Sequence, residues 1–418
     1  PSLGEAFCST VLVPEFWACL EERRPAHLPQ AAPRLPELLG LDDVVAAFTR
    51  GGDTGATACF KRGEPYLREN LFLAYLDRAA LSLSDAERHL RPLLELCQAL
   101  TPAFEYVTAR LVLEPPDIRG QALRTDSDVL VLQLWGEQRL TVRRSVSSMP
   151  LTAPRGALLA PDLRPGDVLL LPPGVECQAS AGAPLGGASS GGATGSSARS
   201  WGPSLYAMLT LRTSEQSFEA SLGRYLTDLL LTGGFTPEAD GFLRSAAAKH
   251  SVPERYAPAR GSQPRPAAGE LREKLMRSAG ELASNINVAD FRKHFDARML
   301  QLRTDQSKGA EGLLAGSTTA GPRPPPGIVQ MTSLIAVCKG IVCRCQPGTE
   351  VAHFKRGSET LNLPIGRSAS EMIHRLSDGE PHVVGSLPCD DPIERLCVCQ
   401  VLLLKGCLEA LEPPAAGP

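Results

Sequence analysis

The sequence predicts an α+β protein in which a β-barrel or β-sandwich is flanked by helical regions. Residues 102–215 contain many short apolar segments separated by turns with Gly and Pro, a pattern typical of barrels and sandwiches. On both sides of this region, apolar residues recur at helical spacing. The length of 418 residues exceeds what one compact core usually holds, so we expect roughly two to four domains.

The first segment, residues 1–101, is expected to be mainly helical. Apolar side chains recur at helical spacing in residues 16–20. A second helix is predicted over residues 84–99, because Ser84 and Glu87 resemble a capping box that precedes an apolar face.

The barrel segment, residues 102–215, is expected to hold several short strands. Each is a continuous or alternating apolar run that ends at a turn. The Gly-, Ala- and Ser-rich residues 181–200 cannot bury a core, so we expect a flexible insert between two strands. The predicted strands lie at residues 106–113, 129–134, 139–143 and 204–211, and a further apolar strand lies between two turns within residues 163–174.

The second half of the chain is expected to contain a helical region, a linker and a small α/β domain. The helical pattern covers residues 216–308, and the Gly- and Pro-rich residues 309–327 predict a linker. The domain at residues 328–418 has the size and element content of a winged helix. Its strands are expected at residues 334–343 and 360–363, and its helices at residues 368–376 and 393–406.

Composition narrows the function classes. The formal net charge is −3, so no overall basic field attracts nucleic acid or anionic lipid. No apolar run of about 18 residues occurs, so we expect no transmembrane helix and no membrane association. The twelve cysteines include no CxxC pair, and we expect them to be reduced thiols.

Four sequence stretches, taken in order, resemble the ribosomal-oxygenase family of JmjC proteins. This family comprises 2-oxoglutarate-dependent protein histidyl-hydroxylases that are also described as histone lysine demethylases. The resemblance covers nearly the whole chain. It implies a double-stranded β-helix (cupin/JmjC) barrel with helical elaborations, a helical dimerisation region at residues 216–308 and a C-terminal winged helix. The stretches are Val112–Glu114 with Pro115, Pro116 and Gly120; Val131–Gly136; Leu163–Gly174; and Val384–Asp390 with Lys405 and Gly406.

The resemblance implies a ferrous iron held by a His-x-Asp…His set, with 2-oxoglutarate as cosubstrate. None of the seven histidines lies between His89 and His250, so the predicted barrel contains no imidazole. Alignment forward from Gly120 places Arg124 and Asp126 on the first two ligand positions, and the last falls on Cys177. Alignment backward from Gln133 moves the first two positions to Leu123 and Thr125. We prefer the first alignment because it keeps a carboxylate at Asp126.

The cosubstrate positions are also changed. The lysine that the family places two residues after the glycine of its second motif falls on Gln138. Arg139 is its neighbour, but adjacent strand residues face opposite sides, so Arg139 would need a bulge to substitute. A tyrosine of the family aligns with Val112, and a later serine falls near Arg212.

Two hypotheses for function follow from the resemblance. One is an iron- and 2-oxoglutarate-dependent dioxygenase that hydroxylates a histidine of a ribosomal protein or demethylates a histone lysine. The other is a catalytically inactive pseudo-oxygenase that acts as a protein-binding scaffold, or as a transcriptional or ribosome-assembly adaptor. Arginine stays protonated in proteins and cannot ligate a metal, so the chemistry favours the second hypothesis.

The resemblance also implies a cellular context. We expect a homodimer, ribosomal proteins or histone tails as partners, and a nuclear, specifically nucleolar, location. The predicted winged helix offers few basic residues, so we expect it to mediate protein contacts or dimer packing rather than direct nucleic-acid binding.

Overall fold

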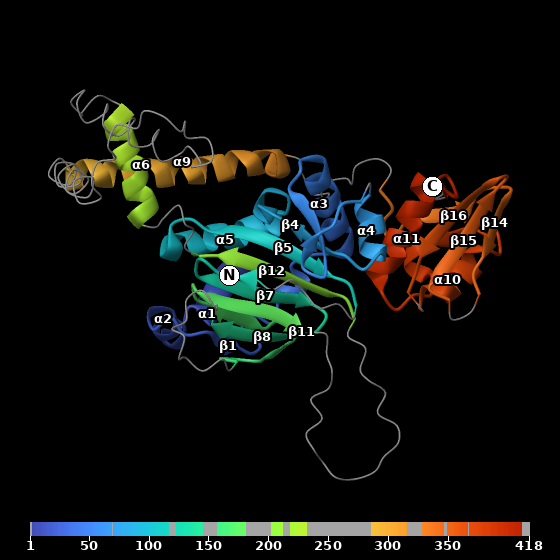
Figure 1. Ribbon diagram of the computed structural model, residues 1–418, viewed down its shortest axis with the longest axis horizontal. Helices are drawn as coiled ribbons and strands as arrows, with labels where there is room; N and C mark the ends of the chain where they lie inside the picture. The colour runs from blue at the N-terminus through green and yellow to red at the C-terminus, as the bar shows by residue number, and fades with distance from the viewer. Residues whose placement is uncertain are drawn as a thin grey trace, which may run out of the picture. The chain divides into compact units, whose positions relative to one another are not determined.

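The computed structural model of the chain is shown in Figure 1. It divides into two compact units, one made of Pro1–Thr213 with Gln306–Pro418 and the other of Ser214–Asp305. The bounds of the second unit lie close to those of the predicted helical region. The structure describes residues 2–68, 70–116, 123–144, 157–180, 202–211, 218–231, 286–315, 328–346, 349–366 and 368–411.

Two antiparallel sheets face each other in the centre of the first unit. One contains the strand order β5-β12-β7-β10 and the other the order β6-β11-β8-β9. The chain therefore winds back and forth between the sheets, which is the topology of a double-stranded β-helix. The strands are β5 (Thr108–Glu114), β6 (Leu123–Arg124), β7 (Val129–Trp135), β8 (Gln138–Arg144), β9 (Asp162–Leu163), β10 (Val168–Leu171), β11 (Val175–Ser180) and β12 (Ser204–Thr210).

The N-terminal region adds strands to both edges of the first sheet. β1 (Ala26–Leu28) pairs with β10, and β4 (Ala80–Leu83) pairs with β5. β2 (Thr57–Lys61) and β3 (Glu64–Pro65) follow β4 and complete an eight-stranded sheet. The prediction that this region is mainly helical therefore missed four strands, because each is only two to five residues long.

Helices cover the same sheet, and their bounds differ from the prediction at one place. The helix predicted over residues 84–99 starts later, at Arg91. Asp85 has a left-handed backbone with φ 49°, which interrupts a helix, and Pro92 suits a first turn. The helices are α1 (Leu3–Val11), α2 (Pro14–Glu21), η1 (Leu35–Glu37), α3 (Leu41–Asp53), α4 (Leu71–Leu76), η2 (Ala86–Arg88) and α5 (Arg91–Phe104).

The two faces of the first sheet belong to different cores. On β7, Leu130, Leu132 and Leu134 pack into the core shared with the helices. The alternating residues Val129 and Val131 pack into a separate core between the two sheets. This alternation fixes which side chains of each strand can reach the interior of the barrel.

The C-terminal part of the first unit holds two three-stranded sheets and two helices. The strand predicted over residues 334–343 is broken by a turn at Gly340, which has a φ of +83°. α4 also meets α11, where the Tyr75 hydroxyl donates to Asp391 Oδ2 over 3.1 Å. The elements are β13 (Leu334–Val337), β14 (Ile341–Arg344), β15 (Val351–Arg356), β16 (Glu359–Pro364), α10 (Ala369–Leu376), β17 (His382–Val383), η6 (Val384–Ser386), α11 (Pro392–Leu404) and β18 (Leu408–Leu411).

The second unit is described through α6 (Phe218–Leu231) and the first part of α9 (Val288–Ala315). The Tyr225 ring packs edge-on against Phe291 with centroids 5.5 Å apart. α9 continues through residues 309–315, so the linker predicted from residue 309 begins with helix. The predicted insert at residues 181–200 lies outside the described residues.

Among the described residues, no single helix is long and apolar enough to cross a membrane. α1 and α2 pass such a test only as a pair bent by 67°. Their apolar residues Phe7, Val11 and Phe16 are buried in the protein core.

Candidate functional site

The candidate site lies where β6 pairs with β11. Cys177 pairs with Leu123 in this register, and both side chains contact the core between the two sheets. The next residue of the same parity, Thr125, is 2% exposed. Its hydroxyl donates to the Pro172 carbonyl over 2.7 Å. The positions that face the barrel are therefore Leu123, Thr125 and Cys177.

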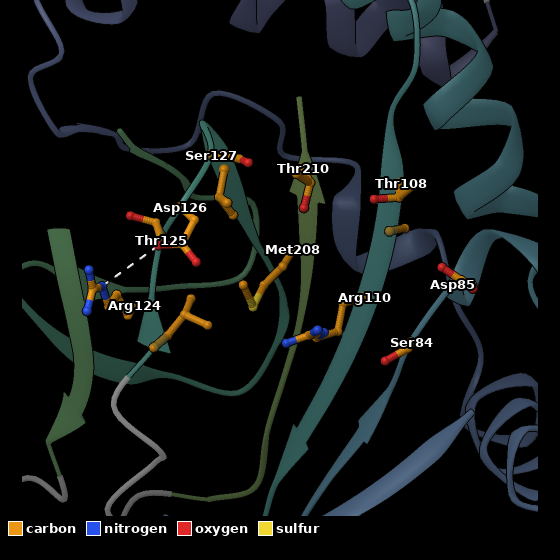
Figure 2. Close-up of a pocket in the computed structure, with 13 residues that line it drawn as sticks. Ser84, Asp85, Thr108, Arg110, Arg124, Thr125, Asp126, Ser127, Met208 and Thr210 are labelled. Carbon is orange, nitrogen blue, oxygen red and sulfur yellow. Dashed lines mark ion pairs between the residues drawn. The ribbon is translucent and has the colours of Figure 1, made fainter. Parts of the chain in front are cut away.

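The preferred alignment put Arg124 and Asp126 on the ligand positions, and the structure places both side chains elsewhere. They are 56% and 85% exposed and form an ion pair with each other at 3.8 Å (Figure 2). Cys177 is buried, so the three residues do not gather at one point. A shift of one residue in a strand exchanges its inward and outward side chains, so the geometry favours the alternative alignment on Leu123 and Thr125.

Cys177 is the one ligand position with a potential metal donor. Burial, together with the nearby Glu114, raises the pKa of the Cys177 thiol to about 12. The thiolate, not the thiol, binds metals, so a metal would have to displace the proton of this buried thiol. Among the described residues, no group of three His, Cys, Asp or Glu side chains is placed to hold a metal ion.

A buried acid inside the barrel was not anticipated from the sequence. Glu114 is 6% exposed, and the Tyr206 hydroxyl donates to its Oε1 over 3.0 Å. Burial raises the pKa of the Glu114 carboxyl to about 7, although the Tyr206 hydrogen bond opposes the rise. The signal was present, since Glu114 follows Val112 at the spacing that places strand residues on one face.

Gln138 lies inside the barrel and joins a network of neutral side chains. Its Nε2 donates to Gln133 Oε1 over 2.9 Å, and Gln133 Nε2 donates to Ser204 Oγ over 2.9 Å. The Gln138 Oε1 atom is buried without a hydrogen-bond partner among the described residues. Position 138 therefore offers amide groups where a dicarboxylate cosubstrate would need a cation.

The other two predicted cosubstrate residues do not supply this cation in the described structure. Arg139 faces away from the interior and binds Asp162 through two hydrogen bonds of 2.6 and 2.9 Å. The strand has no bulge at Arg139, since its register with β11 is continuous. Arg212 lies outside the described residues.

One imidazole does reach the sheet of the barrel, contrary to the prediction. β1 adds His27 to the edge strand β10, a contact that sequence spacing alone could not show. His27 Nε2 lies 3.0 Å from Asp167 Oδ2. Asp167 also accepts from the Gln30 and Arg164 backbone N–H groups; burial alone would raise its pKa, but these bonds and His27 lower it. This pair therefore ties β1 to the turn before β10.

The donor set does not fit ferrous iron with 2-oxoglutarate. An oxygen-activating ferrous site needs two imidazoles and a carboxylate on one face of the metal. The inward-facing positions instead provide an alkyl group at Leu123, a hydroxyl at Thr125 that is already bonded, and a neutral thiol at Cys177.

A pocket of about 280 Å³ opens next to these positions, at the mouth of the barrel. Figure 2 shows Arg110 extending from β5 toward Met208 of β12, with Thr210 beside them. Arg110 forms no ion pair with any described residue, whereas Arg124 and Asp126 pair with each other. We refer to this cavity as the mouth pocket.

The chain is similar to solved ribosomal oxygenases. It matches the ribosomal oxygenase YcfD from Escherichia coli at 13% sequence identity and a TM-score of 0.39, over 94% of this chain and 97% of that chain. The structure of YcfD in complex with cobalt and 2-oxoglutarate matches at 13% identity and a TM-score of 0.40, over 94% of this chain and 98% of that chain. An RmlC-like cupin with a double-stranded β-helix fold from Methanocaldococcus jannaschii matches at 11% sequence identity and a TM-score of 0.17. This match covers 26% of this chain and 72% of that chain.

No protein-family model matches the chain, and the comparison with curated proteins gave no match. Because the structural similarities are weak, the assignment of the double-stranded β-helix rests on the strand order of the two sheets.

Proposed function

We propose that this chain is a ribosomal-oxygenase-like barrel that lacks iron chemistry and acts as a protein-binding scaffold. The observation that carries this proposal is the identity of the three inward-facing positions, Leu123, Thr125 and Cys177. These residues align with the metal-ligand positions of the family, but their side chains offer no imidazole and no carboxylate. What remains is a barrel with an open mouth pocket and, among its described residues, no group of side chains that could hold a metal ion.

The chemical reason is that these side chains are weak metal ligands or have no donor atom. Leu123 has no donor atom, and the Thr125 hydroxyl is held by a backbone carbonyl. Loss of an outer-shell partner alone typically weakens metal binding by ~10–100-fold, and loss of both imidazoles costs more. Glu114, a buried carboxyl that acts electrostatically on Cys177, has its pKa raised to about 7 and is bonded to Tyr206.

The cellular context in this proposal comes from the family resemblance. It comprises a homodimer formed through residues 216–308, ribosomal proteins or histone tails as partners, and a nuclear or nucleolar location. In that setting the scaffold would serve as a transcriptional or ribosome-assembly adaptor rather than as a hydroxylase or demethylase.

The test is an anaerobic titration of the purified chain with ferrous iron and 2-oxoglutarate. An intact ferrous site gives a charge-transfer band near ~500 nm, and we expect no such band here. The matched control restores both the ligand set and the cosubstrate cation with Leu123→His, Thr125→Asp, Cys177→His and Gln138→Lys, and we expect this variant to gain the band. A saturable band from the unaltered chain, checked for folding by circular dichroism, would refute the proposal.

A further inference from the structure

A second, larger cavity of about 680 Å³ is lined by arginines. It is formed by residues 22–25 after α2, by Arg144 at the end of β8, by Leu158 and by residues 173–175 at the start of β11. We call it the arginine pocket. It contains three guanidinium groups, those of Arg23, Arg24 and Arg144, and one carboxylate.

The charges of the arginine pocket are not balanced. Arg24 pairs with Glu22 at 3.2 Å, and both side chains are about three-fifths exposed, so this pair is weak. Arg23 and Arg144 form no ion pair with any described residue. A cavity with two unpaired arginines in a chain of net charge −3 favours an anionic occupant.

The arginine pocket adjoins the candidate site through a shared backbone wall. Arg144 pairs with Val175 at the end of the β8–β11 ladder. The Thr125 backbone N–H donates to the Val175 carbonyl over 3.0 Å, and the Gly174 N–H donates to the Thr125 carbonyl over 2.8 Å. An extended segment bound in the arginine pocket would therefore lie beside the mouth pocket, which holds the unpaired Arg110.

The lining also contains apolar surface. Leu158 is 42% exposed, and Pro25 and Pro173 lie in the same cavity. Of the described residues that line the arginine pocket, none is aromatic, so bases of a nucleic acid would have no ring on which to stack. A lining that combines arginines with apolar side chains fits a peptide that combines carboxylates with an apolar anchor.

We propose that the arginine pocket docks an acidic segment of a partner protein, with an apolar side chain of that segment against Leu158. This inference rests on the proposed scaffold function and names the chemistry of its partner. An acidic partner differs from the basic histone tails that the family resemblance implies. The unpaired arginines would repel a basic segment.

The experiment is a selection of displayed random peptides, about twelve residues long, against the full chain, followed by anisotropy measurements on the enriched peptides. We expect enrichment of acidic peptides with one or two large apolar residues. The double variant Arg23→Gln/Arg144→Gln should bind them roughly tenfold more weakly, because two exposed charge pairs are lost. Binding should also weaken at high salt.

The matched control is Arg62→Gln. Arg62 and Arg23 have similar left-handed backbones, with φ of 55° and 51°, so both substitutions act on the backbone alike. Equal binding by the double variant and the control, enrichment of basic peptides, or no enrichment would overturn the inference. Single-stranded poly-uridine bound through Arg23 and Arg144 without acidic-peptide binding would overturn it in favour of RNA.

The two proposals fail separately. An iron-dependent band in the titration would refute the loss of iron chemistry, whatever the peptides show. A failed peptide selection without an iron band would leave the metal-free barrel intact and remove only this docking site.

Discussion

At the scale of single residues, the barrel contains a carboxyl group that is almost fully buried. Glu114 sits among apolar side chains with Tyr206 as its hydrogen-bond donor. Burial disfavours its charged form and raises its pKa to about 7 from an ordinary 4.5. Between about pH 4.5 and pH 7, the folded chain therefore binds more protons at Glu114 than the unfolded chain does.

The pKa of Glu114 makes the stability of the protein dependent on pH. The contribution of the protonated Glu114 carboxyl to the stability of the fold is fully present below about pH 4.5. It is lost as pH rises through about 7. Glu114→Gln should change the free energy of unfolding little near pH 5. Near pH 8 it should stabilise the chain, by on the order of 3 kcal/mol, because no charge is then buried.

Urea unfolding of both proteins across this pH range measures the effect. Burial also raises the pKa of Glu87 to about 7, but Glu87 titrates in both proteins and cancels from the difference. An unfolding free energy difference that stays constant with pH would contradict the prediction.

At the scale of elements, the turn from β7 to β8 depends on a glycine. Gly136 has a φ of +70°, and an added Cβ would collide with the Pro203 carbonyl oxygen. Gly136→Ala should therefore cost about 1–2 kcal/mol for the left-handed backbone and about 1–3 kcal/mol more for overpacking.

Gly63 is the matched control for this turn. Its φ is +86°, but nothing lies within 4 Å of an added Cβ, so Gly63→Ala should cost only the backbone share. Urea midpoints compare the two variants. Equal losses of stability in the two variants would show that the Pro203 backbone moves away from the added Cβ. The turn would then not be constrained by packing.

The elements also show what the sequence could predict. Continuous apolar runs located β7 and β10, since buried strands need little else to be recognised. β6 has two residues and a short apolar signal, so its register with β11, and hence the choice between Leu123 and Arg124, needed the pairing itself. The capping pattern at Ser84 was misleading because Glu87 instead accepts from the Ala109 backbone N–H over 2.8 Å.

At the scale of the whole molecule, the N-terminal and C-terminal segments share one core. Tyr75 of α4 is 1% exposed and donates to Asp391, the N-cap residue of α11. These residues are separated by 316 positions, so no sequence pattern predicted their contact. The family resemblance did not predict this packing either.

Removal of the Tyr75 hydroxyl should weaken both segments together. Tyr75→Phe leaves the buried Asp391 oxygen without its donor, at a cost of roughly 1–3 kcal/mol. The control is Tyr66→Phe, whose hydroxyl donates to Asp77 in a partly exposed site and should matter less. Fluorescence and circular dichroism should report one shared unfolding transition; a transition confined to the C-terminal segment would contradict this view.

The packed interior between the two sheets has a further consequence. Many metalloproteins depend on their metal to neutralise and order a polar centre, and they fail to mature when the metal is scarce. Here Leu123 and Cys177 pack with the surrounding valines and leucines, so apolar contacts order these positions without a metal. The abundance of this protein would then be set by synthesis and turnover, independent of iron supply.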